Sequence, residues 1–202
     1  MCGLVILCII LIVCAIDHHC GYISMFTTRS KIDMRNYPVV QSMHNSPEAA
    51  DMLAKLNRAN LTVIKYMKQK YKGTVHEKHI NRLDQRYNPD VLGEHIPIGK
   101  KNTSYVTDKG KKIRFCLRPE YDRSTIHDWN ILVFVSMHEI SHIMNITMGH
   151  ESDFWSTFKF ILSNAVEIGL YEPVDYDQYP IVYCNLEVTY NPLYDDSLAS
   201  VV

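Results

Sequence analysis

The stretch His138-Glu139-Ile140-Ser141-His142 constrains this chain more than any other, because its polar residues form one site only if they lie on a helix. Residues four apart on a helix share a face, so His138 and His142 would lie one turn apart and could bind the same metal ion. Glu139 lies one residue further round, on the side where a metal-bound water would be. The spacing therefore predicts a metal site built on a helix.

The residues around this motif predict that the helix is buried. Asp128-Trp129-Asn130 offers a start, with a short polar side chain as N-cap. From Ile131 to Met144 the chain is apolar almost all round, which is typical of a helix covered on every side. Polar groups inside such a helix are costly unless they have partners. A metal ion would satisfy the two histidines and the glutamate together.

A third ligand is predicted shortly after the helix. A catalytic zinc ion usually holds three protein ligands and one water, and Gly149-His150 supplies another imidazole. Gly149 permits a sharp turn that would return the next residue over the helix. Apolar residues then recur at helical spacing from Phe154 to Ile168. The predicted zinc ligands are therefore three histidines: His138, His142 and His150.

Two other interpretations of the motif stay open at this point. The five-residue pattern arises by chance in a chain of this length at about a few per cent, so the histidines could be core residues satisfied by hydrogen bonds. The metal could also be structural, since a sequence does not show whether a fourth ligand position is open.

The stretch HEISHIMNITMGHESDFW resembles the HExxH…GHxxxFW segment of WLM-type and SprT-like zinc metallopeptidases. It is most similar to the short, often membrane-anchored members encoded by large DNA viruses of eukaryotes. The similarity covers roughly residues 100 to 195 and includes IRFCLR, DWNILVFV, FKFILSNAVEIGLY and YPIVYCNLEVTYNPL. The loop that carries His150 departs from the pattern of the cellular enzymes.

This resemblance implies a zincin-like α+β fold, with a small antiparallel or mixed sheet packed on helices that include the motif helix. It implies Zn²⁺ bound by His138, His142 and His150, Glu139 as the catalytic acid and base, and a polypeptide substrate. A β-hairpin is predicted over 104–117, and the resemblance suggests that its second strand, 113–117, is the sheet edge that pairs with substrate. The alternative function is a non-catalytic, zinc-containing structural or assembly protein of a virion or membrane.

The N-terminus predicts a hydrophobic anchor helix. Residues 2–16 form an unbroken apolar run, which suits either an uncleaved anchor or the core of a cleaved secretion signal. The expected organisation is an anchor over 1–26, a polar irregular linker over 27–46 and a metallopeptidase domain over 47–202. Basic residues soon after the run favour the cytosolic face of a host or virion membrane for this single-pass protein.

Charge and cysteine content add two further expectations. With 21 basic and 22 acidic residues the net charge is −1, which does not indicate a bulk polyanion binder. The basic hairpin around Lys109–Arg114 could contact an acidic substrate, nucleic acid or anionic lipid, although a solvated turn explains it as well. Cys116 and Cys184 are the cysteines outside the anchor segment. They could form a disulfide or be two separate buried residues.

A tyrosine near the metal could donate a hydrogen bond to the reaction's oxyanion. The sequence does not choose among five candidates: Tyr171, Tyr176, Tyr179, Tyr183 and Tyr190.

Overall fold

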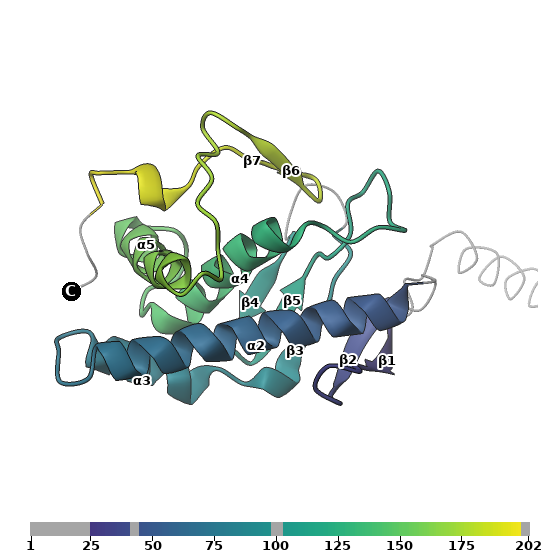
Figure 1. The fold of residues 1–202 in the computed structure, drawn as a ribbon, viewed down its shortest axis with the longest axis horizontal. Helices are drawn as coiled ribbons and strands as arrows, with labels where there is room; N and C mark the ends of the chain where they lie inside the picture. Colours follow the sequence, from purple (N-terminus) through teal and green to yellow (C-terminus); the bar gives the residue numbers. More distant parts are fainter. Residues whose placement is uncertain (1–24, 41–44, 98–102, 199–202) are drawn as a thin grey trace, which may run out of the picture.

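Four α-helices and three small sheets make up residues 25–40, 45–97 and 103–198, which the computed structural model describes (Figure 1). The helices are α2 (Ser46–Lys70), α3 (Glu77–Arg86), α4 (Trp129–Met144) and α5 (Ser152–Glu167). The strands are β1 (Met25–Arg29), β2 (Asn36–Val40), β3 (Leu92–Glu94), β4 (Tyr105–Thr107), β5 (Lys112–Phe115), β6 (Ile181–Tyr183) and β7 (Leu186–Val188). Single 3-10 turns are η1 (Pro89–Val91) and η2 (Pro192–Tyr194). The predicted α+β class is confirmed.

Helix α4, which carries the motif, is the central helix of the fold. It packs against α2, α3 and α5, as its apolar residues on every side require. The side chain of Asp128 accepts a hydrogen bond of 2.8 Å from the backbone N–H of Asn130, so the predicted N-cap is present. The motif His138–His142 therefore lies on a buried helix that three other helices pack against.

Helix α2 supports α4 through both apolar and polar contacts. Pro47 lies in its first turn, and Leu53, Leu56 and Met67 are among the residues it buries. Asn60 is fully buried and satisfied: its side-chain oxygen accepts from the hydroxyl of Ser136 in α4 at 2.8 Å, and its amide donates to the hydroxyl of Tyr87 at 3.1 Å. Because buried polar groups need partners, these bonds define how α2 and α4 lie against each other.

The three-stranded sheet has the order β3-β5-β4, and it differs from the expected arrangement in one respect. The predicted hairpin forms, with Val106 of β4 opposite Ile113 of β5 in antiparallel register. However, β5 also pairs in parallel with β3, so it lies in the middle of the sheet. The prediction that the second hairpin strand is the sheet edge is therefore wrong, because a three-residue strand far upstream covers it. The edge strand is β4.

Residues 27–46 were expected to be irregular, and the structure differs. Strands β1 and β2 form an antiparallel hairpin that packs on α2 and β3. Tyr37, Val39 and Val40 are buried, and the backbone N–H of Val40 donates to the Glu94 carboxylate of β3 at 2.8 Å. Proline lacks the N–H that a central strand needs, so Pro38 disfavours such a strand. Both strands of a two-stranded hairpin are edge strands, where proline is tolerated. Residues 41–44 lie outside the described part.

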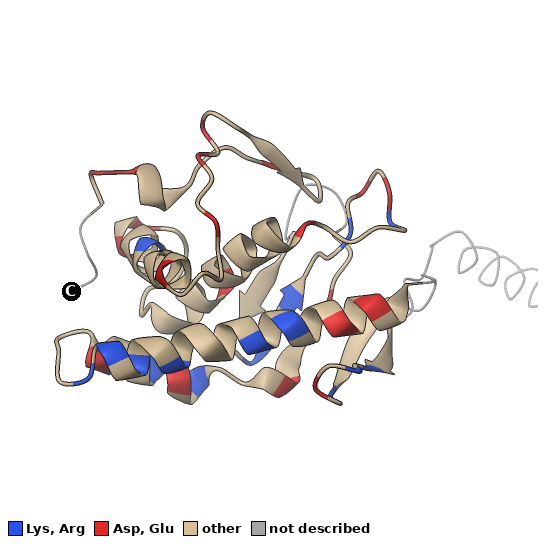
Figure 2. Ribbon diagram, in the orientation of Figure 1, with Lys and Arg blue, Asp and Glu red and all other residues tan. Residues whose placement is uncertain are grey.

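The prediction of a single-pass membrane protein is corrected. Within the described residues, none of the helices is both long enough and apolar enough to cross a bilayer. Helix α4 has 16 residues, whereas a span needs about 20, and the longer α2 carries several lysines and arginines (Figure 2). Met25 and Phe26, the last residues of the predicted anchor over 1–26, lie in strand β1. The apolar run over 2–16 lies outside the described residues.

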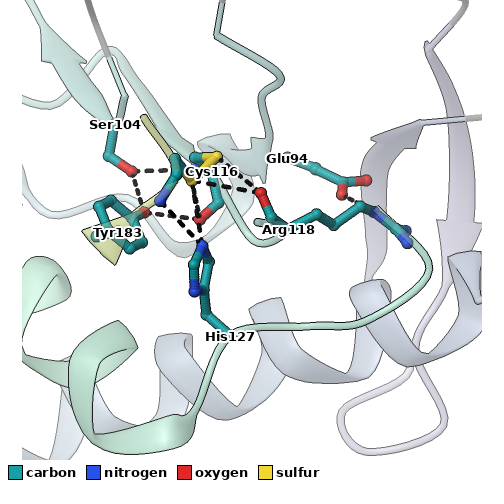
Figure 3. The surroundings of a disulfide bond; sticks show 7 residues. Glu94, Ser104, Cys116, Arg118, His127 and Tyr183 are labelled. Atoms are coloured by element: carbon teal, nitrogen blue, oxygen red, sulfur yellow. Dashed lines mark hydrogen bonds and ion pairs between the residues drawn. A yellow bond between two sulfur atoms is a disulfide. The ribbon is translucent and has the colours of Figure 1, made fainter. Parts of the chain in front are cut away.

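Cys116 and Cys184 form a disulfide, which decides between the two alternatives that the sequence left open. The bond joins the chain just after β5 to the tight turn of the β6–β7 hairpin, 68 residues later (Figure 3). The Tyr183 hydroxyl adds a second tie, because it donates to the backbone carbonyl of Cys116 at 2.7 Å. Together these contacts attach the hairpin to the sheet.

Replacing both cysteines, Cys116→Ala with Cys184→Ala, should lower the free energy of unfolding by about 2–4 kcal/mol, because the disulfide closes a long loop in the unfolded chain. Urea unfolding without reductant measures this loss. Reductant should destabilise the unmodified protein by a similar amount and leave the double variant unchanged. Equal stability of the two proteins without reductant would contradict the prediction.

Candidate metal centre

Three imidazoles meet at one point beside α4. His138 and His142 extend from successive turns of the helix, with their Nε2 atoms 3.3 Å apart, and His150 places its Nε2 3.0 Å from that of His138. One ligand atom from each residue lies within 4.8 Å of the others. The structure thus brings together all three histidines that the sequence singled out.

The spacing of these nitrogens fits a zinc ion. Tetrahedral zinc with Zn–N distances near 2.0–2.1 Å places two ligand nitrogens about 3.3 Å apart, close to the separations of the His138 Nε2 from those of His142 and His150. Glu139 adds a second observation, because its side chain is buried and its Oε2 has no hydrogen-bond partner. An unpartnered buried carboxylate beside a nitrogen cluster is costly. A cation with a bound water would remove that cost.

The ligand loop turns sharply enough to bring His150 back over α4. Gly149 has a φ of +83°, a left-handed conformation that favours glycine. The loop is held at its start by Asn145, whose amide donates to Thr147 at 2.9 Å, and at its end by Asp153, which accepts from the same hydroxyl at 2.5 Å. His150 is therefore positioned by a short hydrogen-bonded loop, although its own side chain is exposed.

Lys109 has a role that the sequence did not indicate. Its ammonium donates to the backbone carbonyls of His142 at 3.2 Å, Asn145 at 3.0 Å and Thr147 at 2.5 Å. It therefore caps the C-terminal end of α4, where cations are favourable, and ties the β4–β5 turn to the ligand loop. A side chain expected to be a solvated or partner-binding lysine is instead used inside the protein.

Aromatic side chains of α5 surround the imidazoles. Phe154 stacks on His142 with ring centroids 4.2 Å apart, and Phe158 meets His138 edge-on at 5.2 Å. Trp155 lies beside His150 at 5.8 Å. Sequence periodicity identified these residues as an apolar helix face, but it did not show that the face orients metal ligands. The rings are held in place by packing, which is the arrangement a preformed metal site needs.

Burial sets the protonation of the site. It lowers the pKa of His138 well below the ordinary histidine value, with further lowering from His142 and His150. It lowers the pKa of His142 to about 4, with smaller contributions from His150 and Lys109, and it also lowers the pKa of His150. Metal ligation needs neutral imidazoles, and these shifts keep them neutral. Burial raises the pKa of Glu139 to about 8, so this carboxyl holds a proton readily.

Two cavities open onto the triad. The larger, about 570 Å³, reaches from His138, Glu139 and His150 toward α5 and the β6–β7 hairpin. The smaller, about 260 Å³, reaches from the same three residues toward strand β4 and the ligand loop. The site is therefore accessible to a molecule larger than water, from two directions that share Glu139.

Among the five candidate tyrosines, Tyr183 and Tyr190 line the larger cavity. The Tyr183 hydroxyl lies 2.6 Å from the hydroxyl of Ser104 and donates to Cys116 (Figure 3), while the Tyr190 hydroxyl donates to Asp195 at 2.7 Å. Tyr171 and Tyr176 are buried in the core. Both cavity tyrosines thus have partners, which places them as parts of the cleft wall.

Zinc binding should persist as the pH falls through 6.5, the ordinary histidine pKa. The folded site holds its imidazoles neutral at lower pH than free histidine does, so protons compete with the metal only in more acidic solution. Dialysis at stepwise pH from 8 to 4, followed by metal analysis, measures the release. Loss of half the zinc already between pH 7 and 6.5 would contradict the prediction.

Comparison with known proteins places the chain among viral sequences. No family model matches it. It is 30% identical over 161 residues to the uncharacterized protein R325 of Acanthamoeba polyphaga mimivirus, covering 79% of this chain and 80% of that protein. Uncharacterized protein 136R of Invertebrate iridescent virus 6 is 30% identical over 97 residues, covering 48% and 53%. Uncharacterized protein 042R of Invertebrate iridescent virus 3 is 31% identical over 93 residues, covering 45% and 55%.

Among solved structures, the chain is similar to Wss1 from Saccharomyces cerevisiae, with a TM-score of 0.47 and 17% identity, covering 64% of this chain and 86% of that one.

Proposed function

The chain belongs to the same family as mimivirus protein R325, and we propose that this chain is a zinc-dependent endopeptidase. One observation carries the proposal: three imidazoles converge within 4.8 Å beside a buried carboxyl group, and open cavities reach them. Structural zinc sites usually have four protein ligands and are closed. A three-histidine site with access from two directions supports the catalytic interpretation over the structural one.

His138, His142 and His150 would hold the zinc ion, which when bound would polarise a scissile carbonyl and lower the pKa of a water to near neutrality. Glu139 lines both cavities, so its carboxylate could accept a proton from the attacking water and return it to the leaving amine. The aromatic residues of α5 and the ammonium of Lys109 hold the ligands at fixed positions. The protein's contribution to catalysis is thus to pre-organise a base beside the metal.

Strand β4 supports a polypeptide as the substrate. Within the described residues, β4 pairs on one edge with β5 and on the other with no strand, and its residues Tyr105 and Val106 line the smaller cavity. An extended peptide can add to such an edge through backbone hydrogen bonds. The proposed substrate strand therefore runs along β4, which takes the role that the sequence suggested for the neighbouring strand.

Nucleic acid receives less support as a partner. Lys109 and Arg114 of the basic hairpin both donate to backbone carbonyls, Arg114 to that of Val91 at 2.7 Å. These two cations are therefore engaged within the protein and are poorly available for phosphate contacts. The other basic residues of the hairpin, Lys111 and Lys112, are exposed, which a solvated turn explains.

Glu139→Gln should retain stoichiometric zinc and lose roughly 10²–10⁴-fold in cleavage rate, because it removes general acid–base catalysis and leaves the imidazoles in place. Cleavage of an unfolded protein and metal analysis measure the two effects. Glu120→Gln, the same change at an exposed loop position, is the control and should match the unmodified protein. Cleavage by Glu139→Gln near the unmodified rate would exclude the assigned role.

His150→Ala should lose most of its bound zinc, because two imidazoles on one helix bind the ion more weakly than three. Metal analysis after dialysis against a weak chelator gives the result. His79→Ala removes an imidazole of α3 outside the triad and should keep its zinc. Full zinc content in His150→Ala would remove that residue from the proposed ligand set.

A further inference from the structure

We infer that the larger cavity binds one side chain of the substrate, at a fixed position on one side of the scissile bond. This side chain is large and apolar, and acidic side chains are disfavoured there. The inference rests on the proposed peptidase function, because the cavity shares His138, Glu139 and His150 with the candidate metal centre. It adds the substrate class, which neither the motif nor the comparisons provide.

The floor of the larger cavity is an apolar surface from two helices. Phe134 and Val135 of α4 and Phe158 of α5 line it, with exposed fractions of 5%, 8% and 0%. These residues are packed in the core on their other sides. The floor therefore cannot collapse into the cavity without moving the core, and the cavity is preformed, as ligand sites commonly are.

The opposite wall comes from the β6–β7 hairpin and the residues that follow it. Leu186 and Tyr190 line the cavity while 47% and 37% exposed, and Val188 lies between them. Trp155 of α5 also lines the cavity, with its ring centroid 5.0 Å from that of Tyr190. Exposed apolar side chains that face an apolar floor across an open cavity gain by burying a further apolar group between them.

The β6–β7 hairpin, which forms this wall of the cavity, is anchored to the rest of the protein. Within the hairpin, Tyr183 and Cys184 are buried, and Cys184 is bonded to Cys116 (Figure 3). The backbone N–H of Cys184 also donates to the Nε2 of His127 at 3.1 Å. Because the turn of the hairpin is anchored in this way, the residues immediately after it keep their distance from the floor.

The two cavities differ in the polarity of their lining. The preference for an apolar substrate side chain should therefore apply on only one side of the scissile bond. Asp108, Lys109 and Gly149 line only the smaller cavity, together with part of β4, and this cavity is less than half as large. It offers backbone and charged groups in place of a continuous apolar floor. Glu187 is among the residues of the larger cavity, and its negative charge would disfavour an acidic side chain there.

The first test uses the full chain loaded with zinc and an unfolded protein as substrate, with the cut sites identified by mass spectrometry. Leu, Phe, Met and Ile should be enriched at a single position on one side of the cut. Matched peptides with Leu or Asp at that position should differ in kcat/KM by more than about 10-fold, since a single methylene in such a pocket can change it by about 10- to 200-fold.

Variants of the hairpin connect this preference to the cavity. Leu186→Asp should reduce the Leu-over-Asp preference at least about 10-fold, and Leu186→Ala should weaken it less. Val182→Asp places the same charge at a comparably exposed position of the hairpin that does not line the cavity, and it should keep the preference. Zinc content and thermal unfolding show that each variant folds.

Binding to Glu139→Gln gives a readout without cleavage. The Leu peptide should change the fluorescence of Trp155 and bind at least about 10-fold more tightly than the Asp peptide. Cuts with no side-chain preference, or a preference unchanged in Leu186→Asp, would overturn this inference and leave the peptidase proposal standing. Selective binding without any cleavage by the unmodified protein would overturn the peptidase proposal and support the pocket.

Discussion

The cost of burying polar groups in α4 is the constraint on which the rest of the structure depends. Ten of the sixteen residues of α4 are apolar, yet His138, Glu139 and His142 interrupt that surface. Such groups are tolerated in a core when they have partners or a ligand. The remaining fold supplies the surroundings: other helices cover the apolar sides of α4, and two cavities open where the polar side chains emerge.

The support for this site comes from parts of the chain that are distant in sequence. Lys109 reaches from the β4–β5 turn to three carbonyls at the end of α4, and Phe154 reaches from α5 to stack on His142. The disulfide brings the C-terminal hairpin over the same cleft. A metal site gains affinity and precision when its ligands are held by such outer contacts. Here the outer contacts also shape the space into which a substrate would enter.

Long periodic segments were predictable from sequence, and short ones were not. Helices α2, α3, α4 and α5 carry apolar residues at helical spacing, which local reasoning can use, and α4 also has the side chain of Asp128 as its N-cap. Strand β3 has three residues, and the β1–β2 hairpin contains a proline, so neither carries a clear local pattern. Both become strands because they pair with, or pack on, elements elsewhere in the chain. The same reason explains why β5, expected at the edge, lies in the middle of its sheet.

The sequence by itself determined the chemistry at the centre: two histidines and a glutamate on one helix, a third histidine after a glycine, and the apolar helix faces around them. This was possible because helical spacing is a local property. Only the tertiary structure decided that Cys116 pairs with Cys184, that Lys109 serves the ligand loop, and which tyrosines line the cleft. Those outcomes depend on long-range packing, which places residues together without leaving a pattern in the order of the chain.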